Sequence, residues 1–376
     1  MNEYIFAPVD EESAGVFLTK NIQTMKLTFF SPLLFLVLSM IQNLQAQSSP
    51  GMDSLTKFCE QFPIGTQLSA ALVQDGKTTY YGVKKTEEGV IPIENQSAIF
   101  EIGSTSKVFT SSLLLYGVAE GKVDLETALK KYLKLNKKEK RQATLLQLSN
   151  HSSGLPRLPS NVFTLKTDML NPYKTYGETE LLEYLKMMKL SRAPGEGYEY
   201  SNLGVGLLGY ILTQRFDRSY EELLQFYIFG KLEMKNSTTI RTKVENKLVK
   251  GLNIDGKEVP NWDFGILAGA GAILSSTEDM AKFLTANLNT HTIFDKQHEK
   301  TYTVNENMDM AYGWHIIKPK SGGQLHWHNG GTGGYTSFMA IDLEHKNGLV
   351  ILSNISAFNA NGQGLDKVGI EWLNGL

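Results

Sequence analysis

The chain has 376 residues, of which 41% are hydrophobic and 20% are charged, and this is the composition of an ordinary globular protein. Its 37 lysines and arginines nearly balance 39 aspartates and glutamates, so the net charge of −2 gives no electrostatic reason to expect a nucleic-acid partner. Only one cysteine, Cys59, is present, which excludes an internal disulfide.

The N-terminal region carries the pattern of an export signal. After Met25 and a lysine, an apolar run covers residues 29–41, which is too short for a bilayer that needs about 20 residues. Leu44-Gln45-Ala46 is a plausible cleavage site, so residues 25–47 are predicted to be a signal peptide. Residues 1–24 contain four acidic side chains and are predicted to be a non-native extension of the leader. The mature protein is expected to be exported, periplasmic or secreted, without a stable membrane anchor.

Strand patterns stand at the two ends of the remaining chain. Apolar residues at 68–73 and 78–83, around Asp75-Gly76, predict a β-hairpin. Strand signals then disappear until about residue 310. Two strands are expected at 336–341 and 349–352, followed by a short amphipathic helix at 365–373. Helical patterns between the two ends cover residues 108–120, 179–190, 203–215, 220–229 and 277–288.

This order predicts an α+β fold, in which one antiparallel sheet is built from both chain ends and flanked by helices. The domain is expected to cover residues 48–376. One α/β lobe would combine residues 48–125 and 270–376, and residues 126–269 would form a mainly helical inserted lobe. A cleft between the lobes is the natural place for a functional site.

Ser104-Thr105-Ser106-Lys107 stands at the head of the first long helical pattern. A serine and a lysine at this spacing lie on one face of a helix, one turn apart, which is the minimum needed to activate a serine without a histidine. A second copy, Ser54-Leu55-Thr56-Lys57, has no strand before it. Serine is also a common N-cap, so this motif alone does not separate a nucleophile from a surface serine.

Tyr200-Ser201-Asn202 opens another apolar helical pattern, after the loop Pro194-Gly195-Glu196-Gly197. A phenol can take or give a proton, and an amide two positions later can bond a substrate amide. A core tyrosine with a satisfied hydroxyl is the alternative interpretation.

His328-Asn329-Gly330 begins a glycine-rich segment that leads into the first C-terminal strand. Glycines at a strand edge let a substrate backbone approach, so Gly330 and Gly331 are candidate substrate-binding positions. His326 and His328 would share one side of a strand, which raises a metal site. No third ligand stands at a supporting spacing, so neither a metal nor another cofactor is expected.

These three motifs, in this order and with these flanks, resemble the penicillin-recognising serine hydrolases related to class C β-lactamases. That superfamily includes DD-peptidases, D-aminopeptidases and carboxylesterases. The resemblance runs from about Leu68 to about Asn354. Four further segments are similar to the family's LLTHTSGLP, APG, AGGLVSTAxD and YGxGW patterns, at residues 145–156, 193–195, 269–279 and 312–314.

The resemblance implies a β-lactamase/transpeptidase-like fold and an acyl-enzyme on Ser104. Lys107 and Tyr200 would share the proton duty as a coupled pair, and the sequence does not say which is the base. Asn202 would hold the substrate amide or the lysine. The backbone N–H groups of Ser104 and Gly331 would form the oxyanion hole.

His328 departs from typical class C β-lactamases, which carry the lysine of a K-T-G motif at this place. A neutral histidine offers one donor where a lysine presents a permanent charge, and this disfavours efficient β-lactam hydrolysis. A rival triplet, Lys320-Ser321-Gly322, follows Pro319 in what reads as a loop. His328 is retained as the fourth predicted catalytic residue.

The leading expectation is an exported serine hydrolase that acts through Ser104 on a D-amino-acid peptide or amide or on a β-lactam, in the manner of a β-lactamase or DD-carboxypeptidase. One alternative is a carboxylesterase acting on small acyl esters. Another is a penicillin-binding or sensor domain that acylates with little turnover. The expected partner is a small-molecule or peptide substrate, and the sequence leaves the oligomeric state open.

Overall fold

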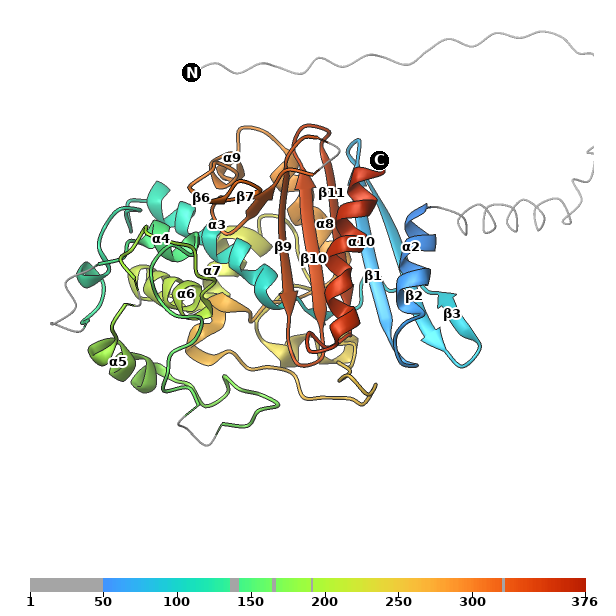
Figure 1. Ribbon diagram of the computed structural model, residues 1–376, viewed down its shortest axis with the longest axis horizontal. Helices are drawn as coiled ribbons and strands as arrows, with labels where there is room; N and C mark the ends of the chain where they lie inside the picture. Colours follow the sequence, from blue (N-terminus) through green and yellow to red (C-terminus); the bar gives the residue numbers. More distant parts are fainter. Residues whose placement is uncertain (1–49, 136–141, 164–166, 191, 320–321) are drawn as a thin grey trace, which may run out of the picture. The chain divides into compact units, whose positions relative to one another are not determined.

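An antiparallel sheet forms the centre of the protein in the computed structural model, which describes residues 50–135, 142–163, 167–190, 192–319 and 322–376. Across these residues the strand order is β3-β2-β1-β11-β10-β9-β8-β7-β6 (Figure 1). Leu68 on β1 pairs with Ser353 on β11, so strands from the two chain ends meet inside the sheet, which confirms the predicted architecture. The strands are β1 (Gln67–Gln74), β2 (Lys77–Thr86), β3 (Gly89–Pro92), β6 (Tyr302–Asn305), β7 (Met308–Met310), β8 (His315–Ile317), β9 (Leu325–Gly331), β10 (Thr336–Asp342) and β11 (Asn347–Ser353).

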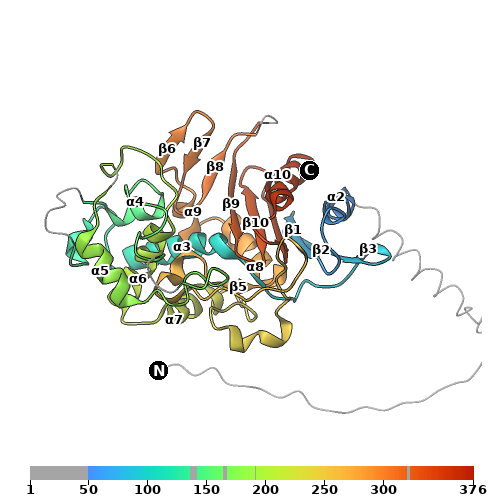
Figure 2. The same cartoon turned by 60° about the horizontal axis from the view of Figure 1, so that its bottom comes forward.

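Helices cover both faces of this sheet (Figures 1 and 2). α2 packs beside α10 on one face, and α8 packs against β1 and β11 on the other. The helices are α2 (Pro50–Cys59), α3 (Ser106–Ala119), α4 (Leu145–Ser149), α5 (Glu178–Met187), α6 (Asn202–Phe216), α7 (Tyr220–Leu224), α8 (Thr277–Leu288), α9 (Ile293–Gln297) and α10 (Leu365–Asn374).

The central strands bury side chains on both faces because the pleat sends successive residues to opposite sides. On β10, Phe338 and Ala340 join the core formed with α2 and α10. Met339 and Ile341 join the larger core formed with α3, α6 and α8. Burial of apolar surface contributes about 25 cal/mol per Å². Packing on both faces therefore stabilises β10, the strand that pairs with β9 and its glycines.

The sequence pattern misses the shortest elements. β3, β6, and the two-residue pair β4 (Phe100–Glu101) and β5 (Leu274–Ser275) lie where no strand is expected. Two residues carry no measurable period, and β6 alternates only between half-buried and exposed positions. The pattern at 220–229 is helical throughout, but α7 continues as a π-helix over Gln225–Phe229.

Some predictions fall outside the described residues. The signal peptide at 25–47 and the extension at 1–24 are among them, as are Lys320 and Ser321 of the rival triplet. The described residues all belong to one compact unit. Among them, no helix is both long and apolar enough to cross a bilayer.

Candidate active site

Ser104 lies in a cavity of about 610 Å³ that is bordered by β9, β10, α10 and the loops of the helical region. It sits on a single 3₁₀ turn, Gly103–Thr105, between β4 and α3, rather than in the first turn of the α-helix. Ser337 on β10 fixes this turn, because its Oγ donates to the Ile102 carbonyl at 2.8 Å and bonds Thr105 Oγ1 at 2.9 Å. The nucleophile candidate is therefore held by the sheet.

Lys107 points back from α3 to Ser104, as the spacing predicts. Its Nζ lies 2.8 Å from Ser104 Oγ and donates to the Ala270 carbonyl at 2.7 Å. The side chain is fully buried, and burial, reinforced by the Arg157 charge, holds the pKa of Lys107 well below its usual range. Such a lysine can be a neutral amine beside a serine hydroxyl.

Tyr200 lies across the same site, immediately before α6. Its ring centroid is 4.9 Å from Lys107 Nζ and 5.1 Å from the Arg157 guanidinium carbon. Burial raises the pKa of Tyr200, while the Ser104 hydroxyl and the Arg157 charge partly oppose that rise. The phenol is therefore protonated in the resting site, with the Arg157 guanidinium over its ring.

The segment that carries Tyr200 is fixed from both sides. Ser201 caps α6 by accepting from the Gly204 N–H at 2.8 Å, and its own N–H donates to His151 Nδ1 at 3.1 Å. The His151 ring packs on the Tyr200 ring with centroids 4.5 Å apart. His151 holds a left-handed backbone with φ of 62°, which is uncommon for a residue other than glycine.

Asn202 is the first residue of α6 and does not line the cavity. Its Nδ2 donates to the Tyr173 hydroxyl at 3.0 Å, and its buried Oδ1 has no hydrogen-bond partner. The predicted contact between Asn202 and the substrate or the lysine stays a prediction.

Gly330 and Gly331 form the edge of β9 that faces the serine turn, and both line the cavity. A Cβ on Gly103, whose φ is 49°, would lie 2.6 Å from the Gly331 nitrogen, and a Cβ on Gly330 would press on the Ile102 carbonyl. Because Thr332 N–H donates to Tyr335, the alternation of an antiparallel ladder turns the Gly331 N–H away from β10. The close approach at the two glycines shows that the backbones of the serine turn and of β9 are in direct contact. The predicted oxyanion donors, the N–H groups of Ser104 and Gly331, belong to these two backbones.

His328 is buried behind this cavity rather than lining it. Its Nδ1–H donates to the Asn329 carbonyl at 2.6 Å, and its Nε2 is buried without a partner. Burial and the neighbouring His315 and Lys107 hold the pKa of His328 well below its usual range. The imidazole is neutral, so it supplies no charge where a lysine of the family would.

The structure brings into the cavity further residues that were not among the predicted site residues. They include Arg157, Tyr198, His315, Asn329 and Asp366. His315 Nε2 bonds the Tyr198 hydroxyl at 3.0 Å, and burial lowers the pKa of His315 to about 4. Arg157 follows the Ser-Ser-Gly-Leu-Pro segment and His315 follows Tyr-Gly-Trp, so adjacency to family-like segments was the available signal.

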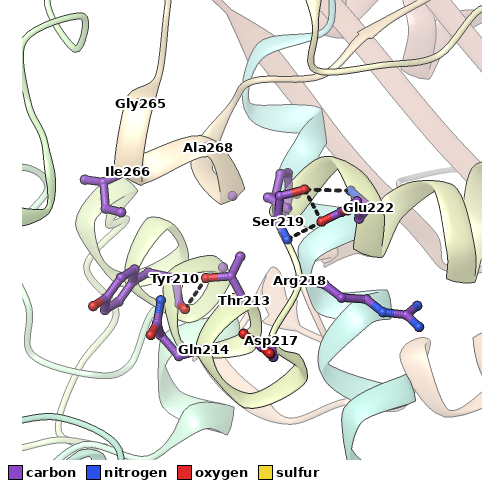
Figure 3. A pocket seen from close by; sticks show the side chains of 13 residues that line it. Tyr210, Thr213, Gln214, Asp217, Arg218, Ser219, Glu222, Gly265, Ile266 and Ala268 are labelled. Atoms are coloured by element: carbon purple, nitrogen blue, oxygen red, sulfur yellow. Dashed lines mark hydrogen bonds between the residues drawn. The ribbon is translucent and has the colours of Figure 1, made fainter.

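Two other hollows, one lined by Ser219 and the other by Ser54, contain a serine but show no serine–lysine contact like that of Ser104 and Lys107. Figure 3 shows one between α6, α7 and residues 265–269, in which Ser219 accepts from the Glu222 N–H at 3.2 Å and bonds its carboxylate as an N-terminal cap of α7. The second S-x-x-K copy lies on α2, where Ser54 Oγ donates to the Pro50 carbonyl at 2.8 Å. Both serines serve helix backbones. Within the described ranges, no group of three or more His, Cys, Asp or Glu is placed to hold a metal.

A serine beside a buried lysine and a tyrosine, next to an edge of backbone donors, has the chemistry of a serine hydrolase: a nucleophile, a base and an oxyanion site. The Beta-lactamase family profile matches residues 59–369, and the chain belongs to that family. A Pseudomonas fluorescens β-lactamase is 28% identical over 260 residues, which cover 66% of this chain and 69% of that protein. The protein flp of Staphylococcus aureus is 25% identical over 77% of this chain, which spans 59% of its length.

Solved structures show the same fold. A β-lactamase/D-alanine carboxypeptidase from Pseudomonas syringae superposes with a TM-score of 0.72 at 19% identity, covering 86% of this chain and 97% of that one. This confirms the expected β-lactamase/transpeptidase-like architecture.

Proposed function

We propose that this serine hydrolase forms an acyl-enzyme on Ser104 with D-amino-acid peptides or amides, or with β-lactams. The observation that carries the proposal is the contact of 2.8 Å between Lys107 Nζ and Ser104 Oγ, made by a lysine whose pKa burial holds low. The names of the relatives, which include β-lactamases and a D-alanine carboxypeptidase, support this choice of substrates.

In the proposed reaction the neutral Lys107 amine accepts the Ser104 proton as Oγ attacks the substrate carbonyl. The oxyanion is stabilised by the N–H groups of Ser104 and Gly331, and one such donor typically contributes about 3 kcal/mol. The Tyr200 phenol, which burial keeps protonated, would pass a proton to the leaving group and would then be reprotonated by Lys107. In deacylation, Lys107 accepts a proton from the water that attacks the ester carbonyl. That proton then passes to Ser104 Oγ as the ester C–O bond breaks, which releases the carboxylic acid and restores the serine.

The neutral His328 favours one second candidate, a carboxylesterase on small acyl esters. The histidine provides no permanent charge for a substrate carboxylate, and Met308, Trp327 and Leu365 add apolar surface to the cavity. An ester needs no carboxylate in the site.

Intact mass measured over time after mixing with benzylpenicillin separates these functions. A lasting adduct on Ser104 supports a penicillin-binding DD-peptidase, and consumption of the drug without an adduct supports a β-lactamase. An intact drug combined with hydrolysis of p-nitrophenyl acetate supports the esterase. Ser104→Ala is expected to abolish all three signals, whereas the matched control Ser54→Ala keeps them; survival of the signals in Ser104→Ala contradicts the mechanism.

We also propose that the protein is exported and that residues 25–47 are removed. The support is the apolar run at 29–41 and the site at Ala46. N-terminal sequencing of protein recovered outside the cytoplasm tests this, and a mature chain that begins near Met1 contradicts it.

A further inference from the structure

Two charged side chains line the Ser104 cavity among the described residues, Arg157 and Asp366, and they have opposite signs. Arg157 extends from the segment after α4 and lies over the Tyr200 ring. Asp366 stands in the first turn of α10, which packs against β10 (Figure 1). A substrate in this cavity therefore meets a cation beside the reacting groups and an anion on α10.

Asp366 has an incomplete set of partners. Its Oδ2 accepts from Asn329 Nδ2 at 2.6 Å, and no described Lys, Arg or His nitrogen lies within ion-pair distance of it. The neighbouring Lys367 is directed to Glu371 instead, with 3.7 Å between Nζ and Oε1. Asn329 belongs to the same strand as Gly330 and Gly331, so it ties this carboxylate to the edge that would bind the substrate backbone.

Burying a carboxylate without a cation is unfavourable. Burial raises the pKa of Asp366 to about 6, and the Asn329 hydrogen bond only partly opposes this rise. The α10 N-terminus favours a negative charge, which explains why a carboxylate is tolerated in the first turn. It does not explain why the side chain faces the catalytic cavity and has no cation beside it.

We propose that Asp366 is a specificity-determining residue that pairs with an organic cation, an ammonium or guanidinium group, on the substrate. This inference rests on the proposed hydrolysis at Ser104 and deepens it. Arg157 repels such a group from the Tyr200 side, so the two charges together fix the direction in which the substrate lies. Asn329 holds one carboxylate oxygen, which leaves the other to accept from the cation.

The experiment compares two p-nitrophenyl alkanoates of equal chain length, one ending in a guanidinium group and the other in its neutral isostere, a ureido group. The quantity measured is the ratio of kcat/KM for the guanidinium ester to that for the ureido ester, tested at several chain lengths. Wild type is expected to favour the cation by about tenfold or more at the best length, as for a charge-assisted pair. Asp366→Asn is expected to bring the ratio close to one.

The ratio cancels any general loss of folding or activity in the variant. Asp53→Asn, which changes an exposed acid in the first turn of α2, is the matched control and keeps the wild-type ratio. A wild-type ratio near one, or an equal ratio in wild type and Asp366→Asn, overturns the proposal.

Failure of the proposed function gives a different result, because neither ester is then hydrolysed faster by wild type than by Ser104→Ala. In that case calorimetric titration of Ser104→Ala with the corresponding guanidinium and ureido amides still decides the inference. Tighter binding of the guanidinium amide that is lost in the Ser104→Ala, Asp366→Asn double variant supports it, and equal affinities overturn it.

Discussion

Replacing Asp366 with asparagine is expected to stabilise the free protein above about pH 6 and to leave its stability unchanged below about pH 4. The pKa of this carboxyl rises from 3.8 to about 6 in the folded state. A pKa difference of one corresponds to about 1.4 kcal/mol, so the rise from 3.8 to about 6 amounts to about 3 kcal/mol. Because solvent reaches part of the side chain, a gain of about 1–3 kcal/mol is expected.

The sign follows from proton binding. The folded state holds the Asp366 proton more tightly than the unfolded state, so wild type loses this stability as pH rises from about 4 to about 6. Asparagine cannot ionise, and its oxygen can still accept from Asn329. The advantage of the variant should therefore appear through that interval and be complete above it.

Urea unfolding followed by tryptophan fluorescence, at a series of pH values from about 4 to about 8, measures this effect. Asp53→Asn, which changes an exposed acid on α2, serves as the control. A stability difference between wild type and Asp366→Asn that is the same at both ends of the series, or a loss at about pH 8, refutes the reasoning.

The remaining predictions concern the catalytic turn and the buried bases. Gly330→Ala should lower kcat/KM at least about a hundredfold, because the new Cβ would lie 2.9 Å from the Ser104 nitrogen. Gly375→Ala, whose Cβ meets nothing closer than 3.4 Å, is the kinetic control. Equal kcat/KM in Gly330→Ala and wild type would contradict the close approach of β9 to the serine turn. Acylation of Ser104 by a fluorophosphonate should slow as pH falls and Lys107 takes up its proton, with a midpoint well below the ordinary 10.5; a midpoint near that value would argue against a lysine base. Burial lowers the pKa of His315 from 6.5 to about 4, so up to about 3 kcal/mol of stability should disappear as pH falls through that interval. In His315→Gln, the urea concentration at the unfolding midpoint should therefore vary less with pH over the same interval. A pH dependence equal to that of wild type would contradict this role of His315.

Much of the fold was predictable because long elements carry long patterns. α8 spans the predicted residues 277–288, and the strands of the predicted hairpin pair as β1 and β2. The pair β4 and β5 was not predictable, since two residues on each side give no period and their contact joins Phe100 to Ser275 across the helical region. Such a pairing is a consequence of tertiary contacts.

Some residues of the site could be predicted from local spacing, and others could not. Ser104 and Lys107 meet because three residues of chain fix their separation, so sequence spacing alone places them together. The position of Asp366 depends on how α10 lies against β10, and the position of Arg157 depends on a loop. No spacing rule connects either residue to Ser104. The His328-Asn329-Gly330 motif predicts where the strand edge lies. It does not predict that the His328 imidazole is buried.

The pairing of β1 with β11 has a consequence for how the protein folds. Leu68 must find Ser353, one of the longest-range contacts that the described chain can make, and β9 with its two glycines is positioned through the same sheet. Contacts of high sequence separation slow folding more than they weaken the native state. The central pairing cannot form until both ends of the chain are present, so the sheet edge beside the catalytic turn is completed late. A circular permutant that links the end of α10 to the start of α2, two helices that pack beside each other, brings β11 and β1 close together in sequence and keeps both helices. We expect it to fold faster while keeping the same active site.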